Sequence, residues 1–231
     1  MSLIIGGLQK TSLLDFPEKI SAIVFTQGCN FRCGYCHNPE LCTFSKKPVI
    51  TLSAFFDFLK NRRGKLDGVV ITGGEPTLHT DLPDFIKDIK NLGFAVKLDT
   101  NGTNPVMLER LICDNLIDYI AMDIKAPLEK YDKITGIKID TALIKQSIDL
   151  IMKSDTDYEF RTTVVRTQLN LDDFEKIGEL LATAKRYYLQ KFIPSKVLNE
   201  EFKNAQTYTD EEFKKIINIL SLKINNVKLR P

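Results

Sequence analysis

Four of the five cysteines in the chain lie within one short stretch, and three of these have the spacing of a metal site. Cys29, Cys33 and Cys36 form a CxxxCxxC motif in the segment GCNFRCGYCHNPELC, and such a short loop can wrap three thiolates around one centre. Thiolates select zinc or iron–sulfur clusters. A closed zinc site would take His37 or Cys42 as a fourth ligand, whereas a cluster held by three thiolates keeps one iron open for a substrate.

The surroundings of these cysteines favour a metal site over simple burial as small hydrophobic side chains. Glycines and polar residues flank them at the end of a predicted strand, where a loop is expected. Cys42, six residues past the triplet, is interpreted as incidental, and Cys113 is expected in the core because it continues an apolar helical pattern. An odd and clustered set of cysteines also differs from a secreted disulfide framework.

The composition predicts a single globular domain over residues 1–231. Hydrophobic residues make up 43% and charged residues 27% of the chain, which excludes disorder, collagen and coiled coil as descriptions of the whole. The net charge of +2 is too balanced for a nucleic-acid-binding stripe or an anionic membrane surface. The first residues lack a signal-peptide pattern, and no apolar run approaches the roughly 18 residues of a membrane span. We expect a cytoplasmic protein that binds neither nucleic acid nor membrane directly.

Six short apolar segments, each followed by a segment of helical periodicity, predict an α/β fold with a parallel sheet. The expected strands are 22–26, 68–72, 94–99, 119–124, 159–165 and 190–193. The expected helices are one capped by Thr51, then 82–92, 105–113 and 141–152, and two that begin with the capping-box pairs Asp172–Glu175 and Thr209–Glu212. Six units fall short of the eight that close a barrel, so we expect a partial (βα)6 TIM-like barrel or an open sheet, with its functional face beyond the strand C-termini.

Polar motifs follow the later strands of this sheet. The second strand runs into GGEP, whose glycines let a backbone approach a ligand and whose Glu75 can accept hydrogen bonds from an ammonium group. The third strand ends in DTNG and the fourth in DIK. Taken singly, these motifs are also compatible with ordinary turns or a surface pair, and Arg161 in the fifth strand with a surface ion pair. His79, just past GGEP, is interpreted as a loop residue rather than a catalytic base.

The motifs CxxxCxYC, GGEP, DTNG and DIK, in this order, resemble those of the radical S-adenosylmethionine (SAM) superfamily, in its branch that activates glycyl radical enzymes. The resemblance implies a radical SAM core at about 18–195, followed by a helix and tail at 207–231. It implies that Cys29, Cys33 and Cys36 hold three irons of a 4Fe–4S cluster, whose fourth iron binds S-adenosylmethionine. It implies cofactor contacts by Tyr35, near the adenine, and by Gly73, Gly74, Glu75 and Pro76, at the methionine amino group. The further cofactor contacts that it implies are those of Asp99, Asn101, Asp123, Lys125 and Arg161. It also implies a small monovalent cation site that includes Asp99, Thr100 and Asp123.

The stretches GGLQKTSLLDFPEKI, FTQGCNFRCGYCHNPEL and MDIKAPLEKYDKITG look most like the second type of anaerobic ribonucleoside-triphosphate reductase activating protein. This implies reductive cleavage of S-adenosylmethionine to a 5'-deoxyadenosyl radical, which takes a hydrogen from a glycine of a large reductase, with flavodoxin or ferredoxin as electron donor. DFPEKI stands where pyruvate formate-lyase activating enzymes usually show DGPGIR, which weakens that alternative. Further alternatives are a radical SAM enzyme acting on a small molecule such as a deazapurine, and a non-enzymatic zinc-binding module.

Overall fold

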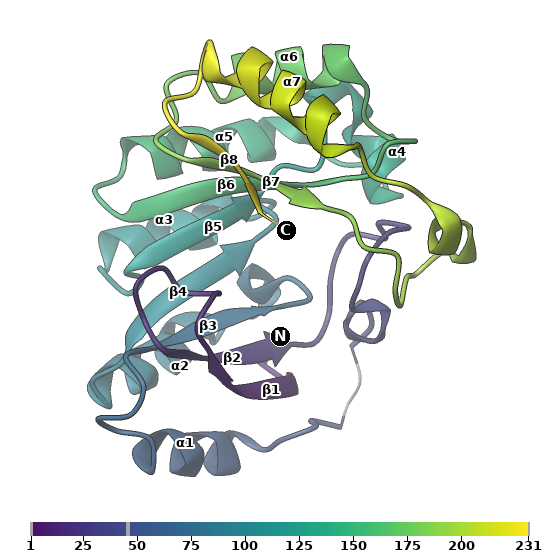
Figure 1. The fold of residues 1–231 in the computed structure, drawn as a ribbon. Helices are drawn as coiled ribbons and strands as arrows, with labels where there is room; N and C mark the ends of the chain where they lie inside the picture. The colour runs from purple at the N-terminus through teal and green to yellow at the C-terminus, as the bar shows by residue number, and fades with distance from the viewer. Residues whose placement is uncertain (1, 45–46, 231) are drawn as a thin grey trace.

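The computed structural model describes residues 2–44 and 47–230, and its centre is one sheet of eight strands (Figure 1). The strands are β1 (Ile5–Ser12), β2 (Ser21–Thr26), β3 (Gly68–Gly73), β4 (Ala95–Thr100), β5 (Tyr119–Asp123), β6 (Asp157–Val164), β7 (Tyr187–Lys191) and β8 (Val227–Arg230). The helices are α1 (Leu52–Lys60), α2 (Leu82–Asn91), α3 (Pro105–Cys113), α4 (Tyr131–Thr135), α5 (Thr141–Lys153), α6 (Leu171–Leu180) and α7 (Asp210–Ser221). Short 3-10 helices are η1 (Pro39–Leu41), η2 (Pro76–Leu78), η3 (Leu128–Lys130) and η4 (Glu200–Asn204).

The order of the strands in the sheet is the order in the chain, from β1 to β8. The strands from β2 to β8 are parallel to one another, and β1 is antiparallel to β2. A doubly wound sheet would reverse its strand order at the centre, and this one does not. The sheet curves with its helices on the outer side, and β1 and β8 form its two edges (Figure 1). The predicted partial barrel is therefore confirmed, with one additional strand at each end of the six expected.

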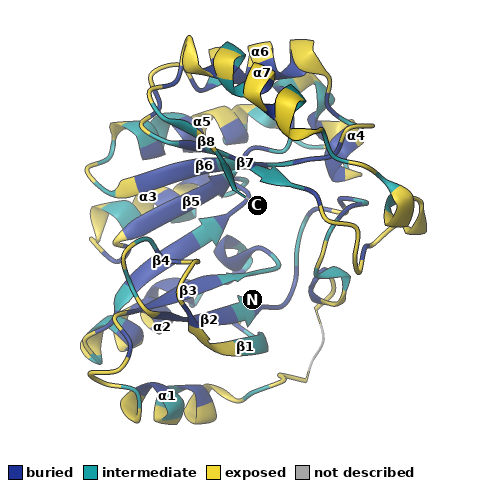
Figure 2. Ribbon diagram, viewed as in Figure 1, coloured by how far each residue is buried: buried dark blue, intermediate teal, exposed yellow. Residues whose placement is uncertain are grey.

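The strands β2 to β5 are buried along most of their length, as their nearly continuous apolar sequences predict (Figure 2). One face packs against the helices and forms the main core. On the inner face, Phe16 from the β1–β2 connection packs with Ile23, Val70 and Tyr119. Because side chains alternate along a strand, the residues two and four positions after Ile23, Val70 and Tyr119 lie on the same inner face. The apolar inner layer thus gives way to a polar layer near the strand C-termini.

Several local predictions are confirmed and several are wrong. Thr51 caps α1, and Thr209 with Glu212 forms the capping box of α7. The capping box of α6 is Asn170–Asp173, not the predicted Asp172–Glu175, because the helix begins two residues earlier. The predicted strand 190–193 is really Tyr187–Lys191, whose side chains alternate between the core and the barrel interior.

Cys113 is also placed differently from the prediction. It is exposed at the C-terminal end of α3, where the helix turns its apolar stripe of Leu108 and Leu111 inward. None of the helices in residues 2–44 and 47–230 is long and apolar enough to cross a membrane. The last residue of the predicted tail, Pro231, lies outside the described residues.

Candidate active site

A pocket opens where the cysteine-containing loop meets the C-terminal ends of the parallel strands. We call it the central pocket. Every sequence motif singled out above contributes to its wall. It is lined by Cys29, Phe31, Cys33, Tyr35, Cys36, His37, Asn38 and Cys42 of the loop, and by Thr72, Gly73, Gly74, Glu75, Asp99, Thr100, Asn101, Asp123, Lys125, Arg161 and Thr163 of the sheet. Pro76 is buried and begins η2, so it is the one predicted site residue that does not line the pocket.

The cysteine loop is closed on itself at its base. The backbone N–H of Gly28 donates to Leu41 O at 2.7 Å, and that of Cys29 donates to Cys42 O at 3.3 Å. Gly28 has φ +90°, a left-handed conformation that favours glycine. These contacts bring both ends of the cysteine segment together beneath the pocket.

Distant parts of the chain hold the outer side of the loop. The N–H of Arg32 donates to Thr135 O at 2.7 Å, and the N–H of Asn199 donates to Gly34 O at 2.9 Å. Gly136, with φ +70°, passes so close to the loop that a Cβ there would lie 2.7 Å from Arg32 O. The loop is therefore fixed from the β5–α5 connection on one side and from the segment after β7 on the other.

The segment 192–208, which we call the covering segment, packs over the aromatic residues of the cysteine loop. Tyr35 contacts Phe192 and Phe202, with ring centroids 6.4 and 6.1 Å apart. His37 stacks on Phe192 at 5.3 Å, and its Nε2 lies 3.1 Å from Ile193 O. Tyr35 is buried in this cluster and forms part of the pocket wall.

The four thiols of the loop have unequal surroundings. Burial raises the pKa of Cys29 to about 12 and also raises that of Cys33. The contact with Cys42, whose Sγ lies 3.8 Å away, lowers the pKa of Cys36 to about 6. Cys42 is thus a buried member of the pocket wall, although its spacing in the sequence indicates an incidental residue.

The donor set suits a soft metal centre, because all four thiols border one cavity. No three His, Cys, Asp or Glu side chains of the described residues converge tightly enough to share a single metal ion. A 4Fe–4S cluster binds each cysteine through a different iron and so needs sulfurs that stand apart. The three motif cysteines line one cavity without forming such a tight group, which fits this requirement.

The glycines of GGEP bring the end of β3 against the cysteine loop. A Cβ on Gly73, which has φ +114°, would lie 2.4 Å from Thr26 N, and one on Gly74 would lie 2.0 Å from Gly28 O. The N–H of Glu75 donates to Gly28 O at 2.7 Å. The sequence predicts that these glycines admit a ligand, and in addition they admit the backbone of the loop.

The carboxylate of Glu75 is buried beneath the pocket and accepts four hydrogen bonds. Its Oε1 accepts from Thr77 N at 3.1 Å, Thr77 Oγ1 at 2.6 Å and Thr100 Oγ1 at 2.8 Å, and its Oε2 accepts from Asn101 N at 2.6 Å. Burial raises the pKa of Glu75 despite these donors. Because Oε2 has a single described donor, it can accept a further hydrogen bond from a ligand ammonium.

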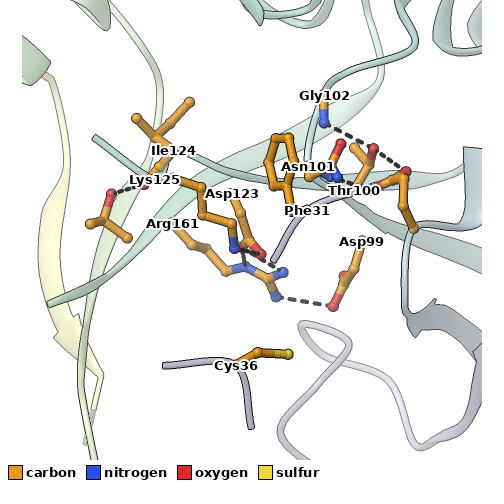
Figure 3. Close-up of polar contacts among 12 residues, drawn as sticks. Phe31, Cys36, Asp99, Thr100, Asn101, Gly102, Asp123, Ile124, Lys125 and Arg161 are labelled. Atoms are coloured by element: carbon orange, nitrogen blue, oxygen red, sulfur yellow. Dashed lines mark hydrogen bonds and ion pairs between the residues drawn. The ribbon is translucent and has the colours of Figure 1, made fainter. Parts of the chain in front are cut away.

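Five charged side chains of alternating sign cross the strand ends, and we call them the charge chain. Lys97 Nζ lies 2.5 Å from Asp99. Arg161 bridges Asp99 at 3.1 Å and Asp123 at 3.0 Å, and Lys125 Nζ lies 2.9 Å from Asp123 (Figure 3). Burial alone would raise the pKa of Asp123, but Lys125 and Arg161 outweigh it and lower the pKa to about 2. Three cations and two anions give this chain a net charge of +1, and its members other than Lys97 line the central pocket together with Cys36.

The predicted cation site does not gain support from these contacts. Arg161 already bridges the two carboxylates that would hold a cation, and the Thr100 hydroxyl donates to Glu75. A cation at Asp99, Thr100 and Asp123 stays a prediction.

Sequence reasoning missed part of the charged interior. Lys97 is only 1% exposed, and its position two residues before Asp99 on the same strand face was the available signal. Glu159 is fully buried, accepts two hydrogen bonds from Arg230 at 2.6 and 2.8 Å, and accepts one from the Tyr119 hydroxyl at 2.8 Å. His79 is buried between Ser2 O and Gln27 O, away from the pocket lining, in keeping with its interpretation as a non-catalytic residue.

Comparison of the sequence and the fold with those of known proteins identifies a family for this chain. The model of the radical SAM superfamily matches residues 23–181. A provisionally named glycyl-radical enzyme activating enzyme of Methanocaldococcus jannaschii is 35% identical over 237 residues, which cover 100% of this chain and 97% of that protein. A 7-carboxy-7-deazaguanine synthase of Aquifex aeolicus is 41% identical over 83 residues, or 36% of each chain. The crystal structure of a radical SAM methyltransferase from Sphaerobacter thermophilus shares the fold, with a TM-score of 0.67, 16% identity, and coverage of 95% of this chain and 68% of that one.

Proposed function

The chain belongs to the radical SAM superfamily, and from that premise we propose that it forms a glycyl radical on a large partner enzyme, an anaerobic ribonucleoside-triphosphate reductase. It is an oxidoreductase of the glycyl-radical enzyme activating kind, from a family that uses a 4Fe–4S cluster and S-adenosylmethionine. The full-length similarity to an activating enzyme supports this proposal more strongly than the short similarity to a deazaguanine synthase.

The observation that carries the proposal is the meeting of four separate motifs in one pocket. CxxxCxxC comes from the loop after β2, GGEP from the end of β3, DTNG from the end of β4 and DIK from the end of β5. A zinc-binding module would need the cysteines alone. The zinc-binding alternative does not explain why the buried carboxylate of Glu75 and the charge chain, with its net positive charge, face the same cavity.

We assign the cluster to Cys29, Cys33 and Cys36. When bound, the cluster and S-adenosylmethionine supply a one-electron cleavage of the cofactor and the hydrogen abstraction that it makes possible. Lys125 favours the thiolate form of all three cysteines, because its charge acts to lower the pKa of each against the effects of burial. Burial outweighs this effect at Cys29 and Cys33, whose pKa values are raised, so Lys125 offsets part of the cost of burying their thiolates.

The remaining pocket residues suit the two ends of the cofactor's amino acid moiety. Glu75 presents Oε2 to an ammonium group, and the net positive charge chain presents Lys125 and Arg161 to a carboxylate. Tyr35 supplies an apolar, buried wall for the adenine.

The proposal is tested first without a partner. Anaerobically reconstituted protein should contain iron and acid-labile sulfide and, when reduced by dithionite, should cleave S-adenosylmethionine to methionine and 5'-deoxyadenosine. Cys33→Ala should abolish cleavage, and Cys113→Ala, which changes an exposed thiol far from the pocket, should not. Zinc without sulfide, or undiminished cleavage by Cys33→Ala, would refute the cluster assignment.

The partner is tested by electron paramagnetic resonance (EPR). Reduced protein, S-adenosylmethionine and purified anaerobic ribonucleotide reductase should give the signal of a glycyl radical, with flavodoxin or ferredoxin replacing dithionite as the donor. The same mixture with pyruvate formate-lyase distinguishes the neighbouring activity. Cofactor cleavage stimulated only by a deazapurine precursor, with no protein radical, would instead support a small-molecule substrate.

A further inference from the structure

Cys42 lines the central pocket but is not one of the three proposed cluster ligands. Its Sγ lies 3.8 Å from the Sγ of Cys36, within the distance of a sulfur hydrogen bond. The residue is 4% exposed and borders the same cavity as the three motif cysteines. Any role for this contact rests on the proposed function, because it takes Cys36 to be a cluster ligand.

The backbone fixes Cys42 in this position. It follows η1, where its N–H donates to Pro39 O at 3.2 Å, and its carbonyl accepts from the N–H of Cys29 at 3.3 Å. The neighbouring Gly28 N–H donates to Leu41 O at 2.7 Å. Backbone contacts on both sides thus hold the side chain against Cys36.

Chemistry decides which of the two sulfurs donates the proton. A cysteine that ligates iron does so as a thiolate, which can only accept a hydrogen bond. Two adjacent thiolates in a buried pocket would repel each other.

We propose that Cys42 is a positioning residue that donates an S–H···S hydrogen bond to the Cys36 ligand and raises the reduction potential of the cluster. A cluster gains negative charge on reduction, and a hydrogen bond to a sulfur ligand stabilises that charge. Cys42 thereby eases the one-electron reduction that must precede cofactor cleavage.

The experiment compares midpoint potentials in the full chain. Wild type, Cys42→Ala and Cys42→Ser are reconstituted anaerobically, and the reduced cluster is followed by EPR during a potentiometric titration without S-adenosylmethionine. Cys42→Ala should have a more negative midpoint, with several-fold less reduced cluster at a fixed potential; a tenfold loss corresponds to about 59 mV. Cys42→Ser, which keeps a donor, should lie nearer the wild type.

Two controls complete the design. Cys113→Ala should match the wild type, because its thiol is exposed and distant. Cys42→Val retains an apolar side chain of similar volume without a donor, and it replaces Cys42→Ala if the latter does not fold. An unchanged midpoint in the variants without a donor overturns the proposal. So does a loss of iron in both Cys42→Ala and Cys42→Ser, which would identify Cys42 as a ligand. Failure of the wild type to assemble a cluster would instead refute the proposed function.

Discussion

Replacing Asp123 by asparagine removes one negative charge from the middle of the charge chain. Asp123 accepts hydrogen bonds from Lys125 and Arg161, and these cations lower its pKa from 3.8 to about 2. Each unit of pKa corresponds to about 1.4 kcal/mol, so the carboxylate contributes roughly 2 kcal/mol to the free energy of unfolding after allowance for its partial exposure. The asparagine side chain would retain the size of the aspartate but would leave Lys125 without its described partner.

The sign of the pH dependence follows from the lowered pKa. The folded value lies below the unfolded one, so the contribution is fully present above about pH 4 and is lost as the pH falls through about 2. Urea unfolding of cluster-free protein should therefore show Asp123→Asn less stable by about 2 kcal/mol at pH 7, with roughly half that difference at pH 3. Asp88→Asn, at an exposed position on α2, is the matched control. A difference that is equally large at pH 3 and pH 7 would show that shape, rather than charge, is responsible.

Three further predictions concern the pocket wall. Gly136→Ala should destabilise the protein by about 1–2 kcal/mol and reduce iron uptake, because the new Cβ would meet the Arg32 carbonyl at a left-handed φ. Thermal unfolding and iron analysis measure the two effects. An unchanged melting temperature would contradict the close approach. Glu75→Gln should weaken S-adenosylmethionine binding at least tenfold in equilibrium dialysis. A neutral amide attracts an ammonium group less strongly than a carboxylate does, and it cannot accept all four described hydrogen bonds equally. Equal affinity of the variant and the wild type would show that Glu75 is not part of the binding site. In cluster-free protein, iodoacetamide should modify Cys36 before Cys29, since the pKa of Cys36 is about 6 and that of Cys29 is about 12. The rate at Cys36 should rise as the pH passes about 6. Peptide mass spectrometry that finds the reverse order would refute the assigned environments of the two thiols.

The parts of the site that could be predicted from sequence share one physical cause. Parallel strands end at the same edge of a sheet, so polar motifs that follow successive apolar runs must meet there. This is why the sequence alone places Glu75, Asp99 and Asp123 near the cysteines. The strands β2 to β5 were recognisable because burial on both faces demands nearly continuous apolar sequence.

The features that escaped prediction depend on tertiary neighbours. β1 lies at an edge of the sheet and contains three consecutive exposed polar residues, Gln9, Lys10 and Thr11, and β8 has only four residues, so neither carries the signal of a buried strand. Lys97 and Glu159 are charged residues inside a core, which is tolerable because each has a partner of opposite charge: Asp99 on the same strand for Lys97, and Arg230 from β8 for Glu159. Cys42 reaches Cys36 through the turn of η1, and sequence spacing alone does not reveal that the chain folds back there.

The covering segment has a consequence for the order of events during biosynthesis. His37 and Ile193, which meet across the edge of the cysteine loop, are 156 residues apart in the chain. At translation rates of about 5–20 residues per second, the ribosome completes the cysteine loop on the order of 10–30 s before the segment that packs over it. The nascent loop spends that interval without its final aromatic neighbours. Iron and sulfide delivered during this interval would meet the loop before Phe192 and Phe202 have packed on Tyr35 and His37.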